Sequence, residues 1–380
     1  MLYLDNAATT PVRTEALKAA WPYLAEEFGN PSSVHEAGLR AKAALDWARQ
    51  TCATYLGVHP EEIVFTSSGT EANNLAIQGM ALGNPRGKHI ISAATEHSSV
   101  LSCLNYLERI HGFEITLLPV SQTGQISPEA LQAALRPDTT LVTLMLANNE
   151  VGTINPISQL AGIASGQGVP FHTDAVQGAG WLDLNVSKLG VQALTLSGHK
   201  FGAPKGSGLA YLSSSLQVEP VTHGGGQEAG LRSGTQNVAW AVALAVASQL
   251  LAEPAAEAAK ARAVTATFID GVLSQFPAAR LTGPTPDSGE RHPAIASFTF
   301  DGVNGETLLL ELENAGVTCS SGSACSAGST EPSHVLTALG LEPDLCRTAV
   351  RFSFGHDATA DQATQAIETL KQALRRVANL

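Results

Sequence analysis

A lysine and an aspartate stand at the ends of two short apolar segments. Lys200 ends the segment 193–200, which a run rich in glycine and proline follows, and Asp174 ends the segment 169–174. If both segments are neighbouring strands, the amine and the carboxylate lie close together. A lysine can form a Schiff base with the aldehyde of pyridoxal phosphate (PLP), and a carboxylate can keep the cofactor's pyridine nitrogen protonated. The pair indicates PLP chemistry, although a surface lysine that closes a strand would leave the same local pattern.

A segment that could bind the cofactor phosphate lies at 63–74. Its residues predict a strand, a turn of small residues and a helix start at Thr70, where backbone amides and the helix dipole favour an anion. An ordinary capped turn between a strand and a helix fits the same residues. Two further segments carry polar groups out of apolar runs: His97 could lie over a planar ring, and Asn149 could offer an amide. No G-x-G-x-x-G or G-x-x-x-x-G-K-[ST] motif occurs, which weakens a nicotinamide or nucleotide interpretation.

The segment 319–334 places Cys325 among serine, glycine and alanine residues. Such small side chains cannot pack down a long loop, so the sequence predicts a mobile segment of the kind that serves as a lid or a swinging carrier. Most cysteines are small buried hydrophobic residues. A cysteine in a flexible polar loop is a better candidate nucleophile, because nearby cations or amides can lower its pKa.

The composition limits the class of protein. The 380 residues include 22 basic and 34 acidic side chains, which give a net charge of −12. This acidic charge argues against nucleic acid or an anionic membrane as the main partner. The N-terminus lacks the basic and apolar regions of a signal peptide, and the longest apolar run, 238–252, is at about 15 residues too short to span a bilayer. Five cysteines without a C-x-x-C pair fit a reducing compartment. We therefore expect a cytoplasmic globular protein.

Short apolar runs alternate with helical patterns up to about residue 252, which predicts an α/β fold with a mostly parallel sheet between helices. Seven runs are typical of buried strands: 63–66, 89–92, 115–118, 141–146, 170–173, 194–196 and 209–212. Beyond residue 252 long helices and alternating strands indicate a smaller α+β domain. We expect a large domain over 13–252 and a small domain over 1–12 and 253–380, which carries the cysteine segment 319–334.

Several motifs recur in a fixed order along the chain. They are the segments 3–11, 28–35, 66–71, 95–97, 148–150, 174–177, 197–200, 232–235, 320–325 and 351–353. In this order and spacing the chain resembles the cysteine desulfurases of the nitrogenase-associated and iron–sulfur-cluster-assembly type, in the class V aminotransferase family of fold-type I PLP enzymes. The match runs nearly end to end. The long S-S-G-S-A-C segment is similar to that of the subgroup with an extended mobile loop.

The resemblance implies a role for each matching residue. Lys200 would hold PLP covalently and shuttle the Cα proton, Asp174 would pair with the pyridinium nitrogen, and Gln177 would hydrogen-bond the ring's phenolic oxygen. His97 would stack on the ring and act in acid–base catalysis, and Cys325 would attack the substrate sulfur. The phosphate contacts would be Gly69, Thr70, Ser197, His199 and, from the partner subunit, Thr235, while the contacts to the substrate carboxylate would be Asn149, which also lies at the cofactor, and Arg351.

These roles imply a homodimeric, PLP-dependent L-cysteine desulfurase that yields L-alanine and a persulfide on Cys325. The sulfur would pass to an iron–sulfur scaffold or another acceptor protein. Alternatives are a selenocysteine lyase, a cysteine sulfinate lyase or an aminotransferase on the same scaffold, and a non-catalytic metal-binding or scaffold module. No resident metal ion is expected, because the ligand spacings of such a module are missing from the sequence. Cys319 could form a disulfide with Cys325, relay sulfur or be a packed bystander.

Overall fold

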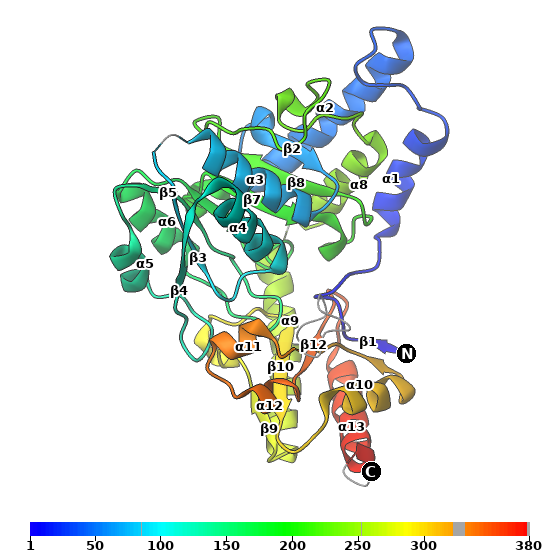
Figure 1. Cartoon of the computed structure of the whole chain (residues 1–380). Helices are drawn as coiled ribbons and strands as arrows, with labels where there is room; N and C mark the ends of the chain where they lie inside the picture. Colours follow the sequence, from blue (N-terminus) through cyan, green and yellow to red (C-terminus); the bar gives the residue numbers. More distant parts are fainter. Residues whose placement is uncertain (85, 252, 322–330, 378–380) are drawn as a thin grey trace.

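The larger part of the molecule is built on a seven-stranded sheet. The computed structural model describes residues 1–84, 86–251, 253–321 and 331–377. The sheet has the order β2-β8-β7-β6-β5-β3-β4, and all seven predicted strands belong to it (Figure 1). The strands are β2 (Ile63–Thr66), β3 (His89–Ala93), β4 (Glu114–Leu118), β5 (Thr139–Thr143), β6 (Phe171–Asp174), β7 (Ala193–Ser197) and β8 (Gly208–Leu212).

The sheet is mostly parallel, as predicted. Strands β4, β3, β5, β6 and β7 run parallel, whereas β8 is antiparallel to both β7 and β2. Parallel neighbours bring their carboxyl ends to one edge of the sheet. In the register of β6 with β7, Asp174 lies opposite Thr195, so the strand that ends in Asp174 is adjacent to the strand that leads to Lys200.

The predicted strand 141–146 is wrong at both ends. Strand β5 covers Thr139–Thr143, because two buried threonines begin it where the sequence lacks an apolar signal. The residues that follow leave the regular ladder but still run beside β6. Leu144 N donates to His172 O at 3.1 Å, and Leu146 N donates to Asp174 O at 2.9 Å.

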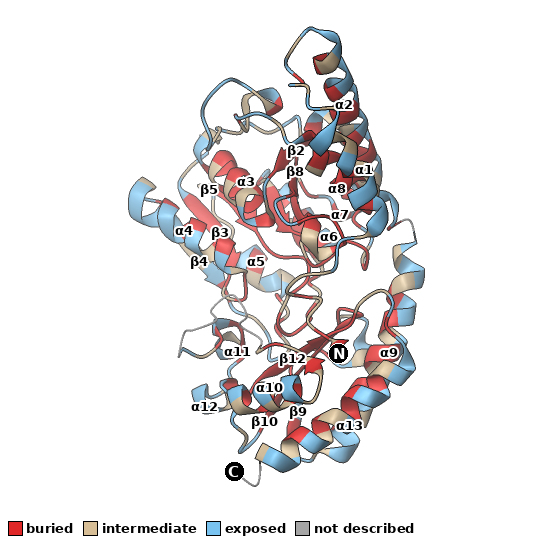
Figure 2. Ribbon diagram, turned by 90° about the vertical axis from the view of Figure 1, so that its right-hand side faces the viewer, coloured by how far each residue is buried: buried red, intermediate tan, exposed pale blue. Residues whose placement is uncertain are grey.

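Helices cover both faces of the sheet, because its central strands alternate apolar residues toward the two sides. Side chains such as Val64 and Ala210 pack with α3 (Gly69–Gly83) and α4 (Ser98–His111). Their neighbours Phe65 and Leu209 pack in the other core layer. Figure 2 shows the buried residues concentrated at the sheet and on the sides of the helices that face it. The helices of that layer are α1 (Thr14–Ala25), α2 (Glu36–Leu56), α5 (Pro128–Ala134), α6 (Ile157–Gly166), α7 (Val186–Leu189) and α8 (Val238–Gln249).

The remainder of the chain forms a second, smaller part of the molecule with its own core. A three-stranded antiparallel sheet has the order β12-β10-β9 and packs aromatic rings against its helices. Its elements are β9 (Ala279–Leu281), β10 (Ile295–Phe300), β12 (Val350–Ser353), α9 (Pro254–Gln275), α10 (Gly305–Asn314), α11 (His334–Ala338), α12 (Pro343–Cys346) and α13 (Ala360–Val377).

The N-terminus adds a strand to this second part. Strand β1 (Leu2–Tyr3) pairs in parallel with β11 (Val317–Thr318), and Leu2 and Leu4 pack in the same core. These contacts support the predicted division into 13–252 and 1–12 with 253–380, which stays a prediction. Among the described residues no single helix is long and apolar enough to cross a bilayer, whereas the bent pair α8 and α9 passes by length and composition together.

Candidate active site

A cavity of about 350 Å³ opens where β6 and β7 end and α3 begins. It gathers residues from both parts of the chain that the sequence analysis had singled out separately. Those residues are Gly69, Thr70, His97, Asn149, Asp174, Gln177, Ser197, His199, Lys200 and Arg351. Cys325 lies outside the described residues, and Thr235 lines a different hollow with Thr66 and Arg232. A single cavity therefore holds the predicted cofactor and substrate residues apart from these two.

One end of the cavity is suited to an anion. Helix α3 begins there with Ser68 as its N-cap, whose hydroxyl accepts from Glu71 N at 3.1 Å. The backbone approaches closely at Gly69, where an added Cβ would lie 2.9 Å from Val176 Cγ2 and 3.1 Å from Ser197 Cβ. The first amides of a helix have no acceptor within it and carry the positive end of the helix dipole. This end of the cavity can hold a phosphate group.

His199 lies at the same end and is uncharged at neutral pH. Its burial, followed by the charges of Lys200 and Lys205, lowers its pKa to about 4. Its Nδ1 lies 3.1 Å from Thr9 Oγ1. A neutral imidazole can contribute a hydrogen bond to a phosphate, but not a positive charge.

Asp174 provides a buried carboxylate at the end of β6. Its side chain is only 5% exposed, and both oxygens accept hydrogen bonds. Oδ2 accepts from Asn73 Nδ2 at 2.7 Å, and Oδ1 accepts from Val176 N at 3.0 Å. The carboxylate is therefore held in one orientation at the wall of the cavity.

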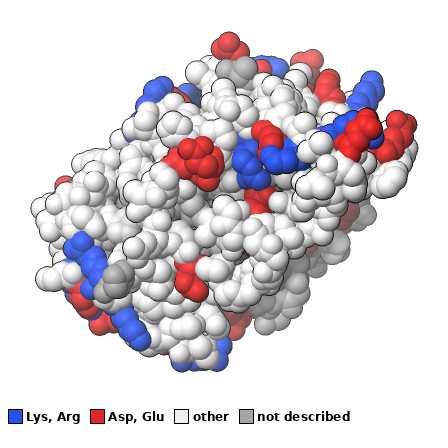
Figure 3. Space-filling model, turned by 90° about the horizontal axis from the view of Figure 1, so that it is seen from above, with Lys and Arg blue, Asp and Glu red and all other residues white. Residues whose placement is uncertain are grey.

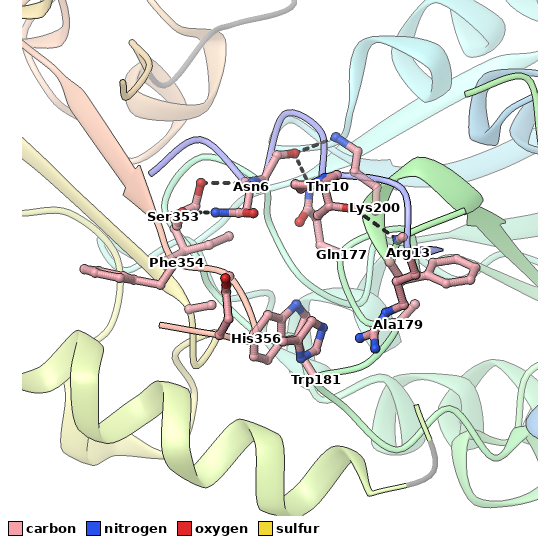
Figure 4. Close-up of a pocket in the computed structure, with 18 of the residues that line it drawn as sticks. Asn6, Thr10, Arg13, Gln177, Ala179, Trp181, Lys200, Ser353, Phe354 and His356 are labelled. Atoms are coloured by element: carbon pink, nitrogen blue, oxygen red, sulfur yellow. Dashed lines mark hydrogen bonds between the residues drawn. The ribbon is translucent and has the colours of Figure 1, made fainter. Parts of the chain in front are cut away.

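Lys200 and Gln177 meet at the N-terminal segment of the chain. Lys200 ends a short 3-10 turn after β7, and its Nζ donates to Ala7 O at 2.5 Å and to Ala8 O at 2.9 Å. Gln177 Nε2 donates to the same Ala7 oxygen at 3.0 Å. Figure 4 shows both side chains pointing toward this segment, at the border with a second cavity that contains the stacked rings of Trp181 and His356. The N-terminal segment thus holds the Lys200 amine beside the Gln177 amide.

His97 caps the start of α4 and faces the same cavity. Its Nδ1 accepts from Ser99 N at 3.1 Å and lies 2.8 Å from Ser99 Oγ. The preceding residue, Glu96, is fully buried, and that burial raises the pKa of its carboxyl well above the ordinary value. Its Oε1 accepts from Met145 N at 2.8 Å. An uncharged Glu96 avoids a second negative charge near Asp174.

Arg351 also lines the cavity and is 1% exposed. One terminal nitrogen donates to Asp5 Oδ1 at 2.7 Å, and the other donates to Asn149 O at 2.8 Å. Its buried Nε has no hydrogen-bond partner among the described residues. A guanidinium in the wall of the cavity suits a carboxylate ligand, and Asn149 is held next to it.

The two described ends of the cysteine segment lie beside these residues. Ser320 pairs with Arg351 through two backbone hydrogen bonds of 3.2 and 2.7 Å. At the other end Ser333 Oγ donates to Glu150 Oε2 at 2.6 Å, and His334 Nε2 lies 2.9 Å from Glu96 O. The chain therefore leaves the site at the arginine and re-enters it beside the turn that carries His97.

Two residues of the site were missed by the sequence analysis. Asn73 and Ser99 line the cavity and connect Asp174 with His97. Asn73 lies within a helix, where its side-chain direction depends on how α3 packs on the sheet. Ser99 follows His97 at a spacing typical of helix capping, which is the signal that could have indicated it.

The residues present fit PLP on observations of this structure. A helix start with a closely packed glycine can take the phosphate, a buried carboxylate with fixed orientation can take the ring nitrogen, and Lys200 reaches the same cavity. Among the described residues no group of three or more histidine, cysteine or acidic side chains could hold a metal ion.

Comparisons with known proteins agree with this geometry. The class-V aminotransferase family matches residues 2–365. The chain is 42% identical over 378 residues to the cysteine desulfurase IscS of Dictyoglomus turgidum, covering 99% of this chain and 95% of that protein. A NifS-like protein superimposes with a TM-score of 0.91 at 33% identity, covering 98% of this chain and 99% of that one. A structure of SspA in complex with cysteine gives a TM-score of 0.82 at 35% identity, covering 93% and 99%.

The chain therefore belongs to the class-V aminotransferase family, whose fold-type I architecture and PLP dependence it shares. Within that family it falls among the cysteine desulfurases. These relatives favour a desulfurase over a selenocysteine lyase or an aminotransferase.

Proposed function

We propose that this protein releases sulfur from L-cysteine, with PLP as cofactor, and forms L-alanine and a persulfide on Cys325. The observation that carries the proposal is the meeting of Lys200, Asp174, His97 and Arg351 in one cavity at the start of α3. A structural relative, SspA, is known in complex with cysteine, which is the substrate proposed here.

The residues divide the work by their position in the cavity. Bound PLP withdraws electrons from the substrate Cα and so weakens the bond between Cβ and sulfur. Lys200 would hold the cofactor and move a proton at the substrate Cα, Asp174 would take the ring nitrogen, and His97 would stack on the ring. Gln177, which is bonded to Ala7 O in this structure, would bind the phenolic oxygen.

The remaining contacts hold the two charged ends. Gly69 and Thr70 at the start of α3, with Ser197 and His199 after β7, would hold the phosphate. Arg351 would bind the substrate carboxylate through its guanidinium, beside Asn149.

The sulfur leaves by attack of the Cys325 thiolate. A bond forms between Cys325 Sγ and the substrate sulfur, and the bond between that sulfur and Cβ breaks. Its electron pair passes to the substrate, which takes up a proton at Cβ and becomes alanine. One cysteine and one thiol give one alanine and one persulfide, so no further oxidant or reductant is needed.

The test is product analysis with L-cysteine and a reducing agent. We expect alanine and sulfide in equal amounts and no keto acid. Lys200→Ala should abolish alanine formation, while Lys205→Ala, a change at an exposed lysine five positions on, should leave the rate unchanged. A keto acid product would indicate an aminotransferase, and alanine from Lys200→Ala at the wild-type rate would contradict the proposal.

A homodimer is part of the same proposal. Thr235 lies outside the cavity of its own chain, which fits a contact to the phosphate of the partner subunit. Large apolar side chains are exposed along α1 and the segment after it: Trp21 is 61%, Phe28 83% and Val34 91% exposed. Seen from above, charged groups are sparse on the surface (Figure 3). A second copy of the chain would cover such a surface.

The sulfur acceptor and the compartment complete the proposal. An iron–sulfur scaffold or another acceptor protein would take the sulfur from Cys325, in keeping with the IscS name of the relatives. The acidic net charge of −12 and the five cysteines without a C-x-x-C pair support a cytoplasmic enzyme.

A further inference from the structure

Asn73 lies at the centre of the site, and the roles described so far do not use it. It belongs to α3, is 1% exposed and lines the cavity. Its amide makes three hydrogen bonds: Nδ2 donates to Asp174 Oδ2 at 2.7 Å and to Ser99 Oγ at 2.9 Å, and Oδ1 accepts from Thr195 Oγ1 at 2.5 Å. One side chain therefore joins β6, β7 and the first turn of α4 at the wall of the cavity.

The hydrogen bonds fix which way this amide points. The oxygen must face the Thr195 hydroxyl, because the opposite orientation would turn it toward the carboxylate of Asp174. Thr195 in turn lies 3.3 Å from Nε2 of the buried His172, whose Nδ1 lies 2.8 Å from Thr143 Oγ1. Burial lowers the pKa of His172 to about 4, so this imidazole is neutral and can donate to Thr195 through Nε2. In this branch Thr143 donates to His172, His172 donates to Thr195, and Thr195 donates to Asn73.

The second branch reaches His97. Ser99 Oγ accepts from Asn73, so its own proton is directed to His97 Nδ1 at 2.8 Å. The backbone N of Ser99 also donates to this nitrogen at 3.1 Å. With two donors aimed at Nδ1, a neutral His97 must carry its proton on Nε2.

We propose that Asn73 is a positioning residue that couples the two sides of the cofactor ring. It fixes the orientation of the Asp174 carboxylate, which would take the ring nitrogen of PLP, and, through Ser99, it selects the tautomer of His97. The proposal rests on the proposed function for the identity of the ring between them. The hydrogen bonds themselves do not depend on it.

The physical basis is the burial of the network. In a site closed to water, a polar group that loses its partner cannot replace it with solvent, so the bonded arrangement is strongly preferred over any other. Among the described residues, removing the amide leaves the Asp174 carboxylate with one donor, Val176 N, and lets the carboxylate rotate. It also leaves Ser99 free to turn its hydroxyl away from His97.

Two substitutions test the role, with a matched control on the same helix. Asn73→Asp keeps the shape and the acceptor for Thr195 but removes both donors and places a carboxylate against Asp174. Asn73→Ala removes all three bonds. The control is Asn74→Ala, at the next position, where the amide bonds only within α3, to Thr70 O at 2.9 Å and to Gln78 Nε2 at 2.7 Å.

Three measurements separate positioning from mere stability. They are the visible circular dichroism of bound PLP, the rate of PLP dissociation, and the nitrogen-15 NMR tautomer of His97 in cofactor-free protein. We expect both Asn73 variants to weaken the dichroic band, to lose PLP faster and to lower kcat/KM roughly 10- to 100-fold, the range typical of outer-shell partners. Asn74→Ala should match the wild type.

The proposal can fail independently of the proposed function. A wild-type protein that makes no alanine would overturn the desulfurase assignment but leave the dichroism and NMR results valid for Asn73. Conversely, if NMR of the wild-type protein finds the His97 proton on Nδ1, the proposed effect of Asn73 on the His97 tautomer is wrong, and no variant is needed to show it. The same holds if both Asn73 variants only lower the melting temperature and keep the band, the dissociation rate and the tautomer.

Discussion

Cys319 has the surroundings of a structural cysteine. It is a free cysteine that packs at the edge of the core formed by Leu4 and Phe352. Burial raises the pKa of its thiol, and the charge of Asp5 adds to the effect. Since the thiolate is the reactive form, this thiol is a poor nucleophile at neutral pH. Among the three hypotheses for Cys319, these surroundings favour a packed bystander over a sulfur relay or a disulfide partner.

The two cysteines should therefore differ under turnover. Without a reductant, wild-type protein given L-cysteine should gain about 32 mass units, one sulfur atom, on the peptide that contains Cys325. Cys325→Ala should bind PLP and cysteine but release no sulfur. Cys319→Ala should keep most of its activity, apart from a loss of stability due to the cavity. Mass spectrometry of the digested protein measures the added sulfur, and turnover of cysteine by Cys325→Ala at the wild-type rate would exclude this nucleophile.

Arg351 shows how a buried charge can remain available for a ligand. Asp5 neutralises the guanidinium, and Asn149 O takes one further donor, so the side chain is held rigidly where it lines the cavity. A lysine lacks the planar fork and cannot keep these contacts in the same geometry. We expect Arg351→Lys to raise KM for cysteine by about tenfold, an estimate that corresponds to one lost charged hydrogen bond. Initial-rate kinetics measure this, and an unchanged KM would argue against carboxylate binding at Arg351.

Helix α3 contributes to the site at its first turn and at Asn73. Its first turn faces the phosphate end of the cavity, and Asn73, one turn further on, reaches Asp174. The apolar residues Leu75 and Ile77 anchor the helix in the core, so its start cannot move independently. The precision of the site thus depends on the packing of one helix against the sheet.

A methyl group at Gly69 should disturb the phosphate end specifically. Because the added Cβ would lie 2.9 Å from Val176 Cγ2 and 3.1 Å from Ser197 Cβ, Gly69→Ala requires either these side chains or the start of α3 to shift. We expect PLP affinity to fall roughly tenfold, about 1.4 kcal/mol. The control is Gly162→Ala within α6, where nothing lies within 4 Å of the added Cβ, and where alanine should stabilise the helix by about 0.5–1 kcal/mol. Equilibrium titration of the cofactor-free proteins with PLP distinguishes the two variants.

The whole molecule buries several histidines in uncharged form. Burial lowers the pKa of His172 and His292 to about 4, and burial with neighbouring lysine charges does the same for His199. His292 joins the two parts of the chain, because its Nε2 lies 2.9 Å from Gln177 O while it precedes β10. Protonation of these rings is therefore linked to unfolding.

The free energy of unfolding should decrease as the pH falls from about 6.5 to about 4. In this window the unfolded chain binds protons at these histidines and the folded chain does not, so each fully buried ring contributes a slope of about 1.4 kcal/mol per pH unit. Glu96 acts in the opposite sense, because its raised pKa keeps it protonated only in the folded state. His292→Gln should flatten the dependence, whereas a change at the exposed His223 should not. Urea unfolding at several pH values measures the slopes, and identical slopes for the wild type and His292→Gln would contradict the argument.

Assembly is the other property of the whole molecule. If Thr235 completes the phosphate site of a partner subunit, a monomer cannot be fully active. Light scattering should give twice the mass of 39.4 kDa at concentrations where the enzyme turns over. Trp21→Glu, which puts a charge on the exposed apolar surface of α1, should shift the mass toward the monomer and lower PLP affinity in parallel. A fully active monomer would contradict the proposed dimer.

The sequence by itself predicted the element types, the edge of the sheet where the cavity opens and most of the polar residues that line it, whose roles stay predictions. Alternating apolar runs predict strands, because burial on two faces dictates their composition, and polar residues that end such runs predict a site at the strand ends. This local pattern predicts the positions of Asp174 at the end of β6 and of Lys200 just after β7. The choice of Cys325 as candidate nucleophile follows from the composition of the segment 319–334, and Cys325 itself lies outside the described residues.

Only the tertiary structure decided which groups hold these residues in place. The bond from Asn73 to Asp174 joins residues 101 positions apart, and that from Arg351 to Asp5 joins residues 346 apart. No local pattern encodes such contacts, because they depend on the packing of α3 on the sheet and on the return of the chain to its own N-terminus. The early start of β5 has the same cause: its two threonines are buried by neighbouring strands, not by their own hydrophobicity. Local sequence sets what each residue can do, and the distances between residues are set by the packing of the whole chain.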